Sequence, residues 1–187
     1  SSKRIPTTDL DGPTAERLSL VLGNDPELTK LMASLGHVFH DVLAFDGSEE
    51  AWIDSKITLD GPFTVETWIK LDPGIDHRDG LLGVSGVIDF NFFDGRFRVW
   101  LGEANDVVQA KKKAVPEVWT HYAVTRDAAG FFRLYINGEL EATSAGPSQS
   151  VFVGANVGRS RLNPASGTTA GWLAEYRVWK LARTPQE

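Results

Sequence analysis

The stretch WTHYAVTRDAAGFFRLYINGELEAT, residues 119–143, decides the fold class. Two apolar-rich runs flank a short segment of small residues, and a second turn signal, Asn137-Gly138, follows at once. Asn-Gly supplies the positive φ angles that a tight turn between strands needs. Leu134 and Ile136 recur at the two-residue period of a strand, so we expect both to point into a core. The stretch therefore predicts short strands joined by tight turns.

The same strand-like pattern recurs along most of the chain. Residues 63–71, FTVETWIKL, alternate between an apolar face and a mixed face. Residues 93–101 contain Asp94-Gly95, a strong signal for a hairpin turn. Further runs rich in β-branched and aromatic residues occur at 37–45, 51–59, 151–158 and 171–181. About ten short strands, with no helical run after residue 37, predict an all-β fold, an antiparallel two-sheet sandwich.

The beginning of the chain has a different pattern. Residues 13–23 and 26–36 each start at a proline and end at a glycine, with leucines at helical spacing between them. Proline near the start and glycine at the end are typical punctuation of a helix. We therefore predict a short N-terminal helical extension over residues 1–36 and a sandwich domain over residues 37–187.

Composition excludes several classes of protein. The chain has 187 residues, of which 42% are hydrophobic and 24% charged, as in a folded globular domain. No apolar run approaches the length of a membrane span. A net charge of −6 argues against a nucleic-acid partner, and the lysines at 111–113 are interpreted as a solvated strand edge. The absence of cysteine excludes disulfides and thiolate metal sites.

Four segments carry a resemblance to a known superfamily. They follow one another in order at residues 44–53, 61–72, 118–140 and 171–187. Together they resemble the laminin-G-like, concanavalin-A-like jelly-roll superfamily, particularly its bacterial and pentraxin-like branch, over about residues 38–187. The resemblance implies that the sandwich is a jelly roll. Lectins, glycanase accessory modules, adhesion modules and some enzymes share this fold, so the resemblance defines function less narrowly.

The sequence lacks the residue patterns of catalysis. Glycanases of the superfamily resemble one another in a strand with two glutamates flanking an aspartate, and retaining hydrolysis needs two carboxyls about 5 Å apart. The nearest acidic groups here are Glu49-Glu50 in a turn and Asp76 and Asp79 in a loop, interpreted as solvated. A Gly-x-Ser-x-Gly motif and the signatures of sandwich-fold lyases are also absent. We predict that the chain is not an enzyme.

Metal ligands are sparse. His37 and His40 lie three residues apart, which puts them on opposite faces of a strand and disfavours zinc. The resemblance implies a structural calcium ion in some members, held partly by an aspartate of the last strand; this chain has Ala174 at that position. Asp46 and Glu175 could still supply oxygens. We expect no metal or other cofactor, and calcium stays open.

The non-core faces of the strands offer a place for a ligand. Sugars stack on aromatic rings and exchange hydrogen bonds with planar polar groups. Strand alternation places such side chains outward, and the candidate ligand-binding residues are Trp68, Arg96, Arg98, Trp100, His121, Arg133 and Tyr135. The arginines suggest an anionic glycan. A purely structural role for these side chains stays open, and so does a site on the loops at 74–80 or 158–169.

These observations favour a non-catalytic carbohydrate-binding module that recognises a polysaccharide or glycan. We expect it to form part of a larger bacterial protein that is secreted or on the cell surface, without a membrane span in the domain. Its first residues lack the apolar core of a signal peptide, so we expect a mature or excised form. One alternative is a protein-interaction module of the same fold. Another is a glycan-active hydrolase or lyase whose site has no recognisable motif.

Overall fold

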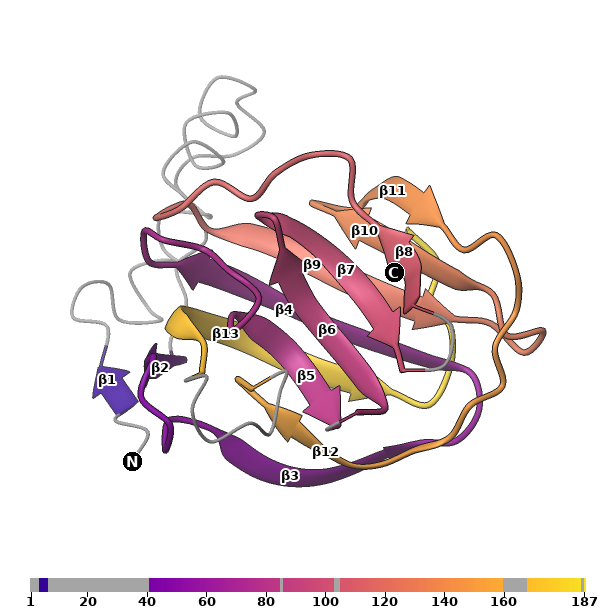
Figure 1. Cartoon of the computed structure of the whole chain (residues 1–187), viewed down its shortest axis with the longest axis horizontal. Helices are drawn as coiled ribbons and strands as arrows, with labels where there is room; N and C mark the ends of the chain where they lie inside the picture. The colour runs from indigo at the N-terminus through magenta and orange to yellow at the C-terminus, as the bar shows by residue number, and fades with distance from the viewer. Residues whose placement is uncertain (1–3, 7–40, 85, 103–104, 160–167, 186) are drawn as a thin grey trace, which may run out of the picture.

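The computed structural model describes residues 4–6, 41–84, 86–102, 105–159, 168–185 and 187. This part of the chain forms thirteen strands and no helix. The strands make two antiparallel sheets that pack face to face, and Figure 1 looks onto the smaller sheet with the larger one behind it. The predicted all-β, two-sheet sandwich is confirmed.

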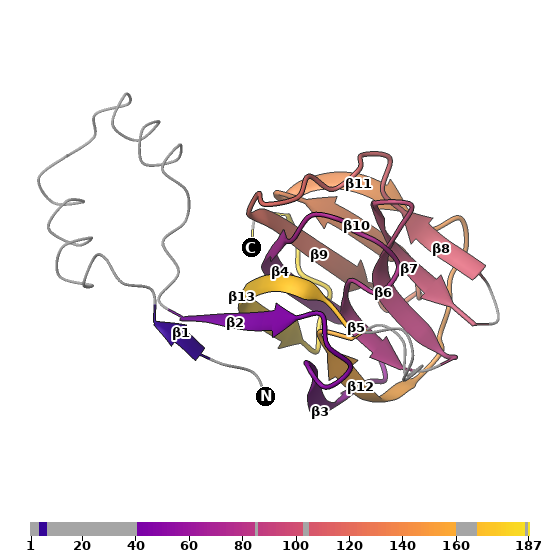
Figure 2. The same ribbon diagram turned by 60° about the vertical axis from the view of Figure 1, so that its left-hand side comes forward.

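The larger sheet, called the large sheet below, has seven strands. Their spatial order is β1 (Arg4–Pro6), β2 (Asp41–Asp46), β13 (Ala170–Trp179), β4 (Phe63–Leu71), β9 (Thr120–Arg126), β10 (Phe132–Ile136) and β11 (Glu139–Thr143). The turned view of Figure 2 shows β1 and β2 at one edge of this sheet. The last strand of the chain, β13, lies between β2 and β4, so the sheet is not built in sequence order.

The other sheet, called the small sheet, has six strands. Their spatial order is β3 (Ile53–Leu59), β12 (Phe152–Val157), β5 (Gly80–Val84), β6 (Ile88–Phe93), β7 (Arg96–Leu101) and β8 (Asn105–Gln109). The hairpin between β6 and β7 turns at Asp94-Gly95, whose φ angles are 51° and 70°. The predicted hairpin is confirmed, because both residues have the positive φ that such a turn requires.

Apolar side chains from both sheets fill the space between them. On β4, Phe63, Val65 and Ile69 are buried, as their alternation predicts. Phe97 of the small sheet packs against Tyr122 of the large sheet with ring centroids 4.9 Å apart. On β4 the alternate residues Glu66, Trp68 and Lys70 point away from the core and are only partly buried, so the outer face of this strand is available for function.

Gly171 allows two strands to approach closely. Its φ is +141°, and a Cβ at this position would lie 2.2 Å from the carbonyl oxygen of Lys70 on β4. No other residue fits such a site without moving the backbone. Glycine is therefore required where β13 passes close to β4.

The predicted division of the chain at its N-terminus stays a prediction. The two helices predicted within residues 13–36 lie outside the described residues, as does the predicted boundary at residue 37. Residues 4–6 are described and form β1, which pairs with β2. We did not predict this strand, because three residues are too few to show a period.

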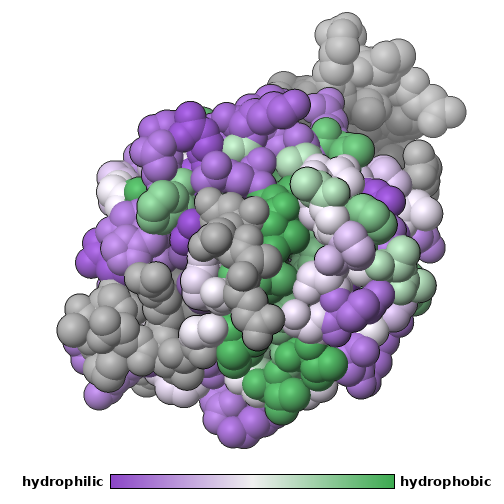
Figure 3. Space-filling model, turned by 45° about the vertical axis from the view of Figure 1, so that its right-hand side comes forward, coloured by the Kyte–Doolittle hydropathy of each residue, from purple (hydrophilic) through white to green (hydrophobic). Residues whose placement is uncertain are grey.

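The surface is not uniformly polar. Large apolar side chains are exposed at Val87, Leu140, Val151 and Val153. In the view of Figure 3, hydrophobic residues gather in a central band and near the lower edge, with hydrophilic residues on both sides. Scattered exposed apolar residues are normal for a folded protein, so they need no separate explanation. In the part of the chain that the structure describes, no helix has the length and apolar character that crossing a membrane requires.

Candidate functional site

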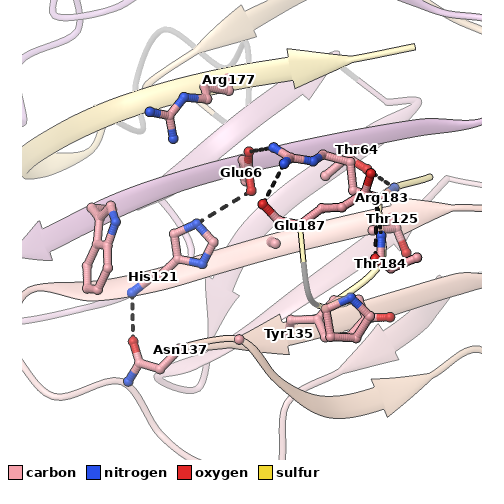
Figure 4. A pocket seen from close by; sticks show the side chains of 14 residues that line it. Thr64, Glu66, His121, Thr125, Tyr135, Asn137, Arg177, Arg183, Thr184 and Glu187 are labelled. Atoms are coloured by element: carbon pink, nitrogen blue, oxygen red, sulfur yellow. Dashed lines mark hydrogen bonds and ion pairs between the residues drawn. The ribbon is translucent and has the colours of Figure 1, made fainter. Parts of the chain in front are cut away.

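A pocket of about 390 Å³ lies on the outer face of the large sheet, the face turned away from the core (Figure 4). Outward side chains of β13, β4, β9 and β10 form its floor and walls, together with residues near the end of the chain. Aromatic, acidic, basic, amide and hydroxyl side chains all line it. Such a mixture around a concave surface is typical of a ligand site.

The hollow arises from the register of the sheet. Arg177 pairs with Glu66, Glu66 with Ala123, and Ala123 with Tyr135, so these four residues form one row across the strands. Ala123 ends in a methyl group, whereas both of its neighbours in the row are long. The short side chain therefore leaves space between Glu66 and Tyr135.

Three side chains hold the carboxylate of Glu66 in the pocket. Its Oε1 accepts hydrogen bonds from Trp179 Nε1 at 2.8 Å and from Arg183 Nη1 at 3.0 Å. Its Oε2 lies 3.7 Å from His121 Nε2, and its side chain is only 12% exposed. A carboxylate this buried needs such partners to offset its lost hydration. They also hold the carboxylate in one orientation, which Figure 4 shows from the pocket side.

Aromatic rings flank this carboxylate. The rings of Trp68 and His121, on directly paired positions of β4 and β9, have centroids 5.3 Å apart. The backbone N–H of His121 donates to Asn137 Oδ1 at 2.9 Å, which fixes the amide at the rim. Tyr135 lines the opposite side. The pocket thus combines flat apolar surfaces with oriented hydrogen-bonding groups.

One end of the pocket is closed by Arg183, Thr184, Pro185 and Glu187. The Thr64 hydroxyl donates to the Leu181 carbonyl at 2.8 Å and accepts the Arg183 N–H at 2.9 Å, so β4 holds this segment down. The Arg183 guanidinium also lies 4.4 Å from the ring centroid of Trp179. These contacts make the end of the described chain a wall of the pocket beside Thr64, whereas the lining on β4 ends at Trp68.

The structure separates the candidate residues into two groups. Trp68, His121 and Tyr135 line the pocket. Arg133 lies on the same face but outside the lining, paired with Asp127 at 2.9 Å. The remaining candidates, Arg96, Arg98 and Trp100, lie on β7 and point outward from the small sheet, on the other side of the sandwich. One ligand-binding face cannot contain both groups.

The arginines expected to bind an anionic glycan already have protein partners. Arg96 contacts Asp94 at 2.6 Å, and Arg98 donates to Asn91 Oδ1 at 3.0 Å while packing 4.2 Å from the ring centroid of Phe93. Arg98 is also only 7% exposed. Among the described lining residues of the pocket, two carboxylates balance two guanidiniums. The observed charges therefore suit a neutral ligand better than an anionic one.

Sequence reasoning missed most of the polar lining. Glu66 was visible on the outward face of residues 63–71, but an alternation does not show which outward residues converge. Arg177 follows a register shift between Ala174 and Arg177, where Glu175 has a φ of 52°. Alternation fails across such a bulge. No sequence signal indicated that Arg183 would pack beside β4.

The two oxygen sources expected for calcium do not meet. Asp46 pairs with Ala170 at the start of β13, whereas Glu175 lies five residues further along that strand and binds Arg177 at 2.7 Å. Ala174 is buried beside Val42, where a carboxylate would lose its hydration. Within the described ranges, no group of three or more potential ligands is placed to hold a metal ion.

The loop at 74–80 also differs from its prediction. Asp79 was interpreted as solvated, but it is buried, and its carboxylate accepts the N–H groups of Asp76 at 2.8 Å and Ala170 at 3.1 Å. Burial raises the pKa of Asp79, in spite of these hydrogen bonds. Its role is to fasten the loop to the start of β13. Of the other candidate loop, 158–169, residues 160–167 lie outside the described part.

Comparison with known proteins identifies the fold. A family model for the concanavalin A-like lectin/glucanases superfamily matches residues 46–187. No curated protein sequence matches the chain. A protein from Bacteroides ovatus assigned to carbohydrate binding is 24% identical with a TM-score of 0.59, and the match covers 71% of this chain and 40% of that protein. The chain thus spans less than half the length of that relative.

Two further solved structures show the same architecture. Domain 4 of AbnA, an extracellular GH43 arabinanase from Geobacillus stearothermophilus, is in complex with arabinotriose; it is 20% identical with a TM-score of 0.56, over 82% of this chain and 88% of that domain. A SAP-like pentraxin from Limulus polyphemus is 16% identical with a TM-score of 0.55, over 77% of both chains. Identities this low establish the fold alone.

Proposed function

The chain belongs to the concanavalin A-like lectin/glucanases superfamily, and we propose that it is a non-catalytic carbohydrate-binding module. Its site is the pocket on the outer face of the large sheet. One observation carries the proposal: the rings of Trp68, His121 and Tyr135 surround a hollow in which Glu66 is held in place. The fold-related carbohydrate-binding protein and arabinanase domain support a carbohydrate as the ligand.

The chemistry of the pocket matches that of a sugar ring. A pyranose presents C–H groups that pack on aromatic faces and hydroxyls that both donate and accept hydrogen bonds. Glu66 and Asn137 supply acceptor oxygens, and Arg177 supplies donors. Because Trp179 and Arg183 already orient Glu66, binding costs little additional ordering. We infer a neutral glycan, because the charges of the lining residues balance.

The same lining argues against hydrolysis. Glycosidases place two carboxyls on either side of the scissile bond. The described lining has Glu66 and Glu187, and the Glu187 carboxylate accepts hydrogen bonds from the N–H and the hydroxyl of Thr184, at 2.8 Å and 3.1 Å. Both carboxylates therefore serve the structure of the pocket wall. As part of the proposal, the parent protein is secreted or on the cell surface, like the extracellular arabinanase.

A matched pair of tryptophan variants tests the location of the site. Trp68 and Trp100 are both half-buried and lie on outward faces of opposite sheets. A glycan array with neutral and anionic polysaccharides identifies a ligand, and calorimetry then measures its affinity. We expect Trp68→Ala to weaken binding about tenfold or more, since an aromatic platform is lost. Trp100→Ala should leave the affinity unchanged.

Each other outcome excludes part of the proposal. Loss of binding in Trp100→Ala, but not in Trp68→Ala, would move the site to the small sheet. Failure of the wild-type protein to bind any glycan would reject the module and favour the protein-interaction alternative. Release of reducing sugars from a polysaccharide would show that the chain is an enzyme after all. Thermal unfolding of both variants confirms that they are folded.

A further inference from the structure

The outer face of the large sheet continues beyond Trp68, where the lining of the pocket on β4 ends. Trp172 on β13 pairs with Lys70 on β4, and the Lys70 Nζ lies 5.2 Å from the centroid of the Trp172 ring. Trp172 belongs to a small apolar cluster on the outer face, whose other members are Val42, Ala174, Trp68 and Trp119. The three tryptophans are only partly buried, so each keeps apolar surface that a ligand can cover.

The cluster is continuous with the pocket. Trp68 belongs to both, and its neighbour Lys70 is the next outward residue of β4. Arg183, Pro185 and Glu187 close the other end, so a ligand longer than the pocket extends toward Trp172. Glu66 and Lys70 are four residues apart on β4, which is about 14 Å along a strand. That distance exceeds the length of a single sugar ring.

The local chemistry at Trp172 is that of a sugar platform. The cation of Lys70 holds the indole in place and offers donors to hydroxyl groups. The cross-strand neighbour of Trp172 on its other side is Ala44, whose methyl group does not shield the ring. A ring held in position beside small neighbours is available for stacking along the strand direction.

We propose that Trp172 and Lys70 form a second saccharide subsite. The ligand is then an oligosaccharide, or an internal segment of a neutral polysaccharide, that lies along the strands of the large sheet. This inference rests on the proposed function of the pocket. It further specifies that the ligand is longer than one sugar and that it lies along the strands. A single terminal sugar would not need the second platform.

The test compares short and long ligands on the intact chain. The probes are xylo-, cello- and arabino-oligosaccharides from the monosaccharide to the hexasaccharide, measured by calorimetry. In the wild-type protein we expect affinity to rise with length as the second subsite fills. In Trp172→Ala we expect the longest oligomers to bind about tenfold more weakly, with disaccharide affinity unchanged. Lys70→Gln should also reduce the rise in affinity with oligosaccharide length, but by a smaller factor than Trp172→Ala.

A control variant separates ligand contact from general destabilisation. Trp52 is also half-buried beside a cation, with the Arg159 guanidinium 5.5 Å from its ring centroid, but it does not line the pocket or the cluster. Trp52→Ala should bind every oligomer like the wild type. Affinity independent of length in the wild-type protein, or a normal length dependence in Trp172→Ala, would overturn the second subsite while leaving the pocket intact. Absence of any binding would instead reject the proposed function itself.

Discussion

Arg126 carries a positive charge into the core of the sandwich. It is 1% exposed, and its guanidinium lies 4.9 Å from the ring centroid of Phe63 and 5.5 Å from that of Phe152. Its N–H groups donate to the carbonyl oxygens of Gly61 and Ser150. Burial lowers its pKa. The planar guanidinium satisfies the backbone of two loops at once, which is how it offsets the loss of hydration.

Arg126→Lys should therefore destabilise the fold. An ammonium group cannot reproduce the forked contacts to both loops, so at least one carbonyl is left without its donor. We expect the free energy of unfolding, measured by urea denaturation, to fall by about 3 kcal/mol. The control is Arg133→Lys on the neighbouring strand. Because the ion pair of Arg133 with Asp127 is partly exposed, this variant should change the free energy of unfolding by less than about 1 kcal/mol. An equal loss of stability in Arg126→Lys and Arg133→Lys would contradict the inference that the Arg126 guanidinium holds the two loops.

At the scale of elements, Asp94 in the turn between β6 and β7 has two roles: its backbone forms the turn, and its side chain forms ion pairs. Asp94 adopts a φ of 51°, and its carboxylate contacts Arg96 at 2.6 Å and Lys113 at 3.4 Å. Lys113 is the largest cause that lowers the pKa of Asp94, followed by a hydrogen bond from Arg96. The hairpin is thereby tied to the segment that follows β8.

The stability that Asp94 contributes should depend on pH. A carboxyl with a lowered pKa stabilises the folded state above its unfolded pKa, about 3.9, and this contribution is lost as the pH falls through the folded pKa. Asp94→Asn keeps the turn, because asparagine also tolerates a positive φ. Urea titrations should show the variant less stable at neutral pH and equal to the wild type in acid. A difference that is constant from neutral to acidic pH would contradict this assignment.

The elements themselves were largely predictable from the sequence. Residues 63–71 show their outward and inward faces by period alone, and Asp94-Gly95 and Asn137-Gly138 mark two turns with the φ angles they require. The convergence of Glu66 with Arg183 was not predictable, since it depends on a bulge in β13 and on a packed segment without period. Local pattern encodes a strand, whereas the pocket depends on contacts between distant parts of the chain.

At the scale of the whole molecule, the two outer faces point in opposite directions. Alternation correctly placed Trp68 and Trp100 on non-core faces, but a period contains no information on which sheet a strand joins. Only the strand order separates the two tryptophans. The site prediction therefore combined residues from both sides of the sandwich, and the structure brings together Trp68, His121 and Tyr135 of the large sheet.

We expect calcium to leave the stability of the protein unchanged. Asp46 faces the start of β13, and Glu175 is about 17 Å away along that strand, whereas calcium ligands lie within about 2.6 Å of the ion. Melting temperatures measured with calcium chloride and with EDTA should agree. A melting temperature that rises and saturates with calcium would reveal a site and contradict this expectation.

The position of β13 has a consequence for how the chain is made. Two groups of strands, β1–β2 and β4–β9–β10–β11, are joined in the large sheet only through β13, the last strand in the sequence. During synthesis β2 and β4 therefore emerge before the strand that pairs with both of them, and each keeps a row of unpaired backbone N–H and C=O groups. Those two strand edges are joined only after residue 179 has left the exit tunnel, so until then the nascent chain exposes edges of the kind that favour aggregation.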